Sequence, residues 1–143
     1  MDLGNYTWLI LALLDAFFAA LVTIFGKMGL KTIDSTVATS VRAVVMAITM
    51  LVVVALLGKL PQILDITSSD MKFILLSGVS GALSWVFYFA ALKLTDASKV
   101  APIDRASLLF IIIMSYLLLG EKITLKTAIA GVLVLLGVLV LTF

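Results

Sequence analysis

Apolar residues fill five long runs of this chain, and polar residues gather between them. The runs cover Trp8–Gly26, Val37–Leu57, Lys72–Leu92, Ala97–Leu119 and Leu125–Phe143. Each run is close to the ~20 residues that an α-helix needs to cross the hydrocarbon core of a bilayer. Helices satisfy their own backbone hydrogen bonds in lipid, so the pattern predicts five transmembrane helices.

The composition supports this prediction. Of the 143 residues, 64% are hydrophobic and only 13% are charged, whereas a soluble domain carries about 25% charged residues. We therefore expect an all-α membrane protein with one transmembrane domain over residues 1–143. The net charge of +2 does not indicate a nucleic-acid partner.

Other functional classes find little support in the sequence. The chain has neither Cys nor His, which removes disulfides, soft metal sites and imidazole catalysis. No nucleotide-binding motif and no pair of acids at catalytic spacing is present. We expect no enzyme activity, no cofactor and no metal.

Short polar segments mark the ends of the predicted helices. Asp34 or Ser35 is suited to cap the second span, residues 67–70 (TSSD) the third, and Thr124 the fifth, because their side-chain oxygens accept bonds from free N–H groups. Gly58 and Pro61 are expected to end the second span.

Four charged residues lie more than one helical turn inside the predicted spans: Asp15, Arg42, Asp104 and Arg105. Such residues are costly in a bilayer and usually face a protein interior or a water-filled cavity. Burial disfavours the ionised form of a carboxyl, so Asp15 is a candidate for proton exchange. Equally, a protonated Asp15 can simply hydrogen-bond a neighbouring helix.

Arg42 and Asp104 enter the membrane from the same side to a similar depth. They are therefore able to pair, and pairing would relieve the cost of each buried charge. The pair is interpreted either as a gate or substrate anchor, or as a static contact that fixes helix packing. A third alternative is that Arg42 extends to the lipid headgroups.

The structural role of Pro102 depends on where the fourth helix begins. If the helix begins at Ala101, Pro102 is an ordinary first-turn residue and Asp104 complements the helix dipole. If capping by Asp96 starts the helix, Pro102 is interior and kinks it. The capping signal and the apolar Val100 favour the longer helix.

The third span divides into two halves. Ser77, Gly78, Ser80, Gly81 and Ser84 give its first half a surface suited to close packing against another helix. Trp85 and Tyr88 follow, three residues apart on one helix face. They are candidates for stacking a substrate, with plain packing as the alternative.

The basic residues around the spans set no clear orientation. With Arg42 and Arg105 counted as intramembrane, Lys27, Lys31, Lys93 and Lys99 flank one side, and Lys59, Lys72, Lys122 and Lys126 flank the other. Cytoplasmic loops normally hold the excess of Lys and Arg. A balanced distribution therefore favours insertion in both orientations. The alternative is a single topology with the N-terminus outside.

Several segments in order resemble one family. They are residues 20–29 (ALVTIFGKMG), 38–42 (ATSVR), 84–93 (SWVFYFAALK), 97–107 (ASKVAPIDRAS), 119–122 (LGEK) and 130–138 (AGVLVLLGV). Together the chain resembles a single five-span EamA-type repeat of the drug/metabolite transporter superfamily. The resemblance implies half of an inverted-repeat transporter fold, working as an antiparallel homodimer in the cytoplasmic membrane. Asp15 is the nearest equivalent of the membrane-embedded Glu of the small multidrug resistance proteins, which are distant relatives.

Two functions follow from these observations. The first is a secondary transporter of a small metabolite or drug-like solute that works by alternating access, with its cavity between spans one, three and four of two copies. Its candidate substrate or proton-binding residues are Asp15, Arg42, Trp85, Tyr88, Asp104 and Arg105. The alternative is a non-transporting membrane subunit of single topology that serves as an assembly partner.

Overall fold

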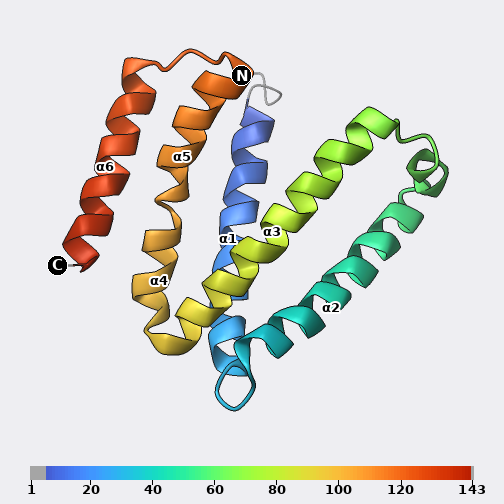
Figure 1. Cartoon of the computed structure of the whole chain (residues 1–143), viewed down its shortest axis with the longest axis horizontal. Coiled ribbons are helices and arrows are strands. Elements are labelled where there is room, and N and C mark those ends of the chain that lie inside the picture. Colours follow the sequence, from blue (N-terminus) through green and yellow to red (C-terminus); the bar gives the residue numbers. More distant parts are fainter. Residues whose placement is uncertain (1–5, 143) are drawn as a thin grey trace. The chain divides into compact units, whose positions relative to one another are not determined.

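The computed structural model describes residues 6–142, and every long element in it is a helix. The long helices are α1 (Thr7–Gly29), α2 (Ser35–Leu56), α3 (Ser68–Leu94), the pair α4 (Ala97–Asp104) and α5 (Ser107–Met114), and α6 (Leu125–Thr142) (Figure 1). A 3-10 helix, η2 (Leu60–Ile63), follows α2, and a π-helical segment, η3 (Ser115–Leu119), follows α5. Residues 97–119 count as one span, so the predicted fold of five membrane-length helices is confirmed. Phe143, which the fifth predicted span included, lies outside the described residues.

The chain divides into two compact units. One unit runs from Ile24 to Lys93 and contains the end of α1 together with α2 and α3; we call it the α2–α3 unit. The other comprises the chain up to Thr23 and from Leu94 onward; we call it the α4–α6 unit, and in it α6 packs against α4 and α5. Each unit is described by itself below.

The predicted caps form as the local sequence indicates. The Asp34 carboxylate accepts hydrogen bonds from the backbone N–H groups of Thr36 and Val37, at 2.8 and 3.2 Å. At α3, the Asp70 N–H donates to Thr67 Oγ1 at 3.2 Å, and the same hydroxyl donates to the Asp70 carboxylate at 2.7 Å. These bonds satisfy N–H groups that have no partner within the helix.

Thr124 caps α6 in the same manner, because the Thr127 N–H donates to its hydroxyl oxygen at 3.2 Å. At the other end of α2, Gly58 has φ +68°. Its N–H donates to Ala55 O, and the Lys59 N–H donates to Val54 O, both at 3.0 Å. This pair of bonds is the Schellman arrangement, which needs a left-handed residue that glycine supplies without steric penalty.

The fourth span begins early and is broken, as the longer of the two predicted helices requires. It starts at Ala97 with Pro102 inside it, so Pro102 is not a first-turn residue. Proline cannot donate to a carbonyl four residues back, and the helix ends at Asp104. Tight i to i−3 bonds, such as Ala106 N–H to Ile103 O at 2.9 Å, bridge the break to α5.

One expectation about this span is wrong. Asp96 takes the N-cap position with extended backbone, but its side chain makes no capping hydrogen bond. Instead the Asp96 carbonyl accepts the first helical bonds, from Lys99 and Val100. The helix therefore starts without the carboxylate contact that the sequence indicated.

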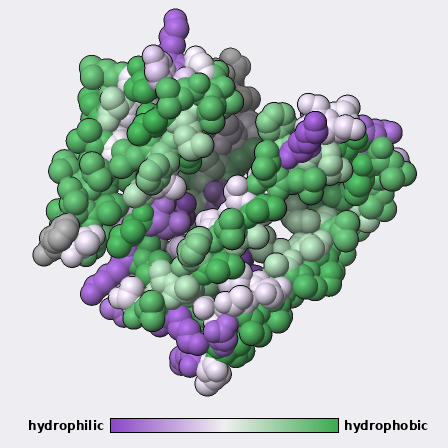
Figure 2. Space-filling model, in the orientation of Figure 1, coloured by the Kyte–Doolittle hydropathy of each residue, from purple (hydrophilic) through white to green (hydrophobic). Residues whose placement is uncertain are grey.

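Burial is confined to small patches, and apolar side chains cover the outside of the helices. In the α2–α3 unit, Leu92 is 0% exposed, Phe89 2% and Leu30 3%. Figure 2 shows hydrophobic residues along most of the visible helix surfaces. Lipid tails are as apolar as these side chains, so such a surface needs no polar cover within a membrane.

Candidate substrate site

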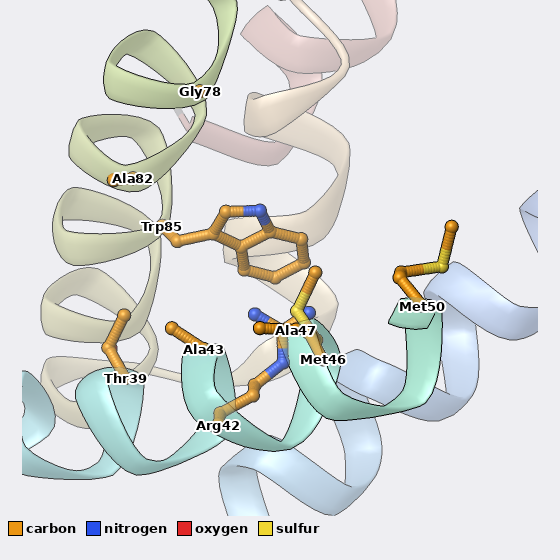
Figure 3. Close-up of a pocket in the computed structure, with 9 residues that line it drawn as sticks. All are labelled: Thr39, Arg42, Ala43, Met46, Ala47, Met50, Gly78, Ala82 and Trp85. Carbon is orange, nitrogen blue, oxygen red and sulfur yellow. The ribbon is translucent and has the colours of Figure 1, made fainter. Parts of the chain in front are cut away.

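Arg42 of α2 and Trp85 of α3 form a cation–π contact inside the α2–α3 unit. The guanidinium carbon of Arg42 lies 3.6 Å from the centroid of the Trp85 ring, and Figure 3 shows the guanidinium beneath the indole. A cation over an aromatic face is attracted by the ring quadrupole, and tryptophan is the strongest partner of this kind. The indole contacts one face of the guanidinium. The N–H groups at the edge of the guanidinium take no part in this contact.

The aromatic face of α3 supports this contact. Trp85 and Tyr88 meet edge to face with 5.7 Å between ring centroids, so the two side chains adjoin as their spacing predicts. Phe89 joins them, at 5.7 Å from Trp85 and 5.9 Å from Tyr88. The Arg42 guanidinium also lies 5.3 Å from the Phe89 ring. The three rings therefore pack on one another, and Trp85 and Phe89 contact the Arg42 guanidinium.

The end of α1 presses against this cluster. A Cβ atom on Gly26 would lie 2.7 and 2.9 Å from two atoms of the Phe89 ring. Lys27, the next residue, donates from its Nζ to the carbonyl of Leu92 at 2.6 Å. Lys93 in turn donates from its Nζ to the carbonyl of Ile33 at 2.8 Å. These contacts join the end of α3 to the end of α1 and to the connection before α2.

A cavity of about 320 Å³ opens beside Arg42 (Figure 3). Its walls come from α2 and α3, and its lining residues are Thr39, Arg42, Ala43, Met46, Ala47, Met50, Gly78, Ala82 and Trp85. Gly78 was expected to pack closely against another helix, but a Cβ atom added there would meet nothing within 4 Å. The small residues of α3 thus leave space beside the arginine, and this volume suits a small ligand.

The remaining candidate residues belong to the α4–α6 unit, and all of them are exposed there. Asp15 lies on α1, eight residues after its start at Thr7, which places it about 12 Å along the helix. Asp104 ends α4, and Arg105 follows at the break. Arg105 also borders a groove of about 450 Å³ between α4 and α6.

The predicted pairing of Arg42 with Asp104 stays a prediction, because the two residues belong to different units. Within the α2–α3 unit the only carboxyls are Asp34, Asp65 and Asp70. Asp34 and Asp70 cap helices, and Asp65 lies in the connection between α2 and α3. The contacts that the structure shows for Arg42 are those to the two aromatic rings.

Sequence reasoning missed two parts of the site. Phe89 was not singled out, although its spacing of four residues from Trp85 places both on one helix face. No residue of α2 after Arg42 was singled out either, yet Met46 and Met50 line the cavity. Their spacing of four and eight residues from Arg42 is the signal that indicates a shared face.

The comparisons with known proteins agree with this structure. Residues 6–143 match the model of the EamA-like transporter family. The chain belongs to that family. A protein of Sinorhizobium sp named "Uncharacterized transporter in cobO 3'region" is 38% identical over 137 residues, which cover 96% of this chain and 97% of that protein. No solved structure matches the chain.

Membership in the EamA-like family indicates a transporter in a membrane, and five apolar helices fit that role. The similarity to the Sinorhizobium protein extends over nearly the whole length of both chains. The predicted family is therefore confirmed.

Proposed function

We propose that this chain is a secondary active transporter of a small metabolite or drug-like solute in the cytoplasmic membrane, and that it works as an antiparallel homodimer. The observation that carries the proposal is that a relative named a transporter is matched over 97% of its own length by this single five-span repeat. Many secondary transporters pair two repeats of opposite orientation about an axis in the membrane plane. Two oppositely inserted copies of one repeat produce the same arrangement.

The charged residues of the spans support a partner of this kind. Asp15, Asp104 and Arg105 are all exposed. Ionisable side chains within a bilayer normally face protein or water rather than lipid. A second copy supplies that protein surface, and the space between the copies supplies the water.

The transport cycle then has two parts. The two copies rock between states that open to either side of the membrane, as in other inverted-repeat transporters. Asp15 takes up and releases a proton as its surroundings change between the two states, because hydration and burial favour opposite protonation states of a carboxyl. This exchange couples solute movement to the proton gradient.

Metabolite profiling of cells and their medium tests the proposal. Cells that express the chain are compared with cells that express Asp15→Asn, and solutes whose distribution depends on the chain are identified. We expect Asp15→Asn to fold and dimerise but to lose the proton-dependent part of that distribution.

Asp65→Asn is the matched control, since Asp65 lies in a connection outside the spans, and we expect it to behave as the unmodified chain. If neutral substitutions of Asp15, Asp104 and Arg105 all leave the profile unchanged, the chain is not a proton-coupled transporter. That result would instead favour an assembly partner.

A further inference from the structure

Arg42 is a cation inside a membrane span with no carboxylate beside it in its own unit. It lies seven residues after the start of α2 at Ser35, which places it about 10 Å along the helix from that end. The side chain is half-buried. The carboxyls of the α2–α3 unit are all at helix ends or in a connection. An intramembrane cation of this kind normally has a specific partner.

The aromatic contact leaves the hydrogen-bonding capacity of Arg42 available. Trp85 covers one face of the guanidinium at 3.6 Å. The N–H groups of the guanidinium point outward in its own plane, so the stacked ring does not use them. Arginine carries five N–H donors in a planar fork, which matches both oxygens of a carboxylate. Stacking also fixes the plane of the fork, so less freedom is lost when an anion binds.

The lining of the cavity beside Arg42 indicates the chemistry of the part of the ligand that does not contact the arginine. Apart from Arg42 and Thr39, its lining residues are apolar or aromatic. Thr39 Oγ1 already donates to the carbonyl of Ser35 at 2.7 Å, which leaves the arginine as the main polar donor. Met46 and Met50 add flexible thioether side chains, which adapt to ligands of different shape.

We propose that this cavity binds a compact organic anion, whose carboxylate pairs with Arg42 while its apolar part lies between α2 and α3. This inference rests on the proposed transport function and names the substrate class of the Arg42 site. A purely apolar solute leaves the guanidinium without a partner. A solute with a cationic head group is repelled by it.

Fluorescence of Trp85 tests the proposal directly, because Trp8 is the only other tryptophan of the chain. Trp8→Phe, purified as the full chain in phosphatidylcholine nanodiscs, leaves Trp85 as the single reporter. The probes are phenylacetate and its neutral isostere phenylacetamide. We expect a saturable change with phenylacetate and an affinity for phenylacetamide that is roughly tenfold or more weaker, since bonds to charged groups are the stronger ones.

Two variants in the Trp8→Phe background locate the binding group. Arg42→Gln is expected to lose the difference between acid and amide, and Arg42→Lys to retain a weakened preference for the acid. Lys72→Gln is the matched control: it removes a cation of α3 that does not line the cavity, and we expect binding to be unchanged. The comparison of acid and amide on the unmodified site does not depend on the folding of any variant.

Three alternative roles of Arg42 and its cavity give different results in these binding experiments. Equal binding of acid and amide overturns the proposal, because the cavity is then only apolar. A response to phosphatidylglycerol nanodiscs without any response to phenylacetate assigns Arg42 to a lipid headgroup and also overturns it. Loss of the dimer in Arg42→Gln, with no phenylacetate binding, assigns Arg42 to a carboxyl of the second copy. In each of these cases the metabolite profile of Asp15→Asn still tests transport separately.

Discussion

Gly26 of α1 and Phe89 of α3 approach so closely that a Cβ atom on Gly26 would lie 2.7 Å from the Phe89 ring. Phe89 is 2% exposed and lies against Trp85, which holds Arg42. The position of the arginine therefore depends on a glycine of another helix.

Gly26→Ala is expected to destabilise the protein by about 1–3 kcal/mol, the usual cost of forcing extra atoms into a packed region. Gly29→Ala is the control on the same helix, because a Cβ atom there meets nothing within 4 Å. Thermal unfolding in detergent measures both variants. Phe89→Leu in the Gly26→Ala background is expected to restore part of the lost stability. Equal melting temperatures for Gly26→Ala and Gly29→Ala would contradict the close approach of Gly26 to Phe89.

The contact between Arg42 and Trp85 predicts an energetic coupling between the two residues. In a double-mutant cycle of Arg42→Gln and Trp85→Leu, the free energies of unfolding should be non-additive by about 0.5–2 kcal/mol, as expected for a partly desolvated cation–π pair. Trp85→Phe should keep part of the coupling. Additive effects in the cycle would show that the guanidinium gains nothing from the indole.

The cap at Asp34 predicts a dependence of stability on pH. The N–H of Val37, followed by that of Thr36, holds the pKa of the Asp34 carboxyl below its ordinary value of 3.8. A lowered pKa in the folded state stabilises the protein above pH 3.8 and stops doing so as the pH falls through the folded-state pKa.

Asp34→Asn keeps an oxygen that accepts the capping bonds but does not titrate. The melting temperature of the unmodified chain should therefore exceed that of Asp34→Asn at neutral pH, and the difference should shrink below about pH 4. Melting curves of both proteins over that range provide the test. A difference that does not change with pH would argue that the carboxylate charge has no part in the cap.

The balance of flanking lysines predicts that orientation in the membrane can be shifted. Replacing Lys122 and Lys126 with Gln leaves two flanking lysines on their side against four on the other. The side with four should become cytoplasmic, since positive residues are retained there. Reporter fusions at the C-terminus then measure the fraction of molecules in each orientation, and a fraction that does not respond to these changes would argue against control by loop charge.

The sequence predicted those features that depend on nearby residues. The five spans follow from hydropathy, and the caps at Asp34, Thr67 and Thr124 follow from side chains within a few residues of the N–H groups that they bind. The adjacency of Trp85 and Tyr88 follows from helical spacing. Such features need no knowledge of how one helix packs on another.

The features that depend on packing between helices were not predicted. The contact of Arg42 with Trp85 could not be predicted, because it needs the facing sides of α2 and α3 to be known; the pairing of Arg42 with Asp104 stays a prediction. The cavity needs the same information, because Gly78 and Ala82 can either admit a helix or leave space. No residue type in Ser115–Leu119 indicates that this segment is π-helical.

The absence of cysteine from the sequence makes the most direct test of the dimer possible. Thr32 and Gln62 lie in the connections at opposite ends of α2 and are exposed. Each is replaced singly by Cys, and intact cells are treated with a membrane-impermeant maleimide before and after permeabilisation. Opposed insertion predicts that about half of the molecules of each variant are labelled from outside, as a balanced charge distribution requires. Full labelling of one variant and complete protection of the other in intact cells would contradict the antiparallel dimer.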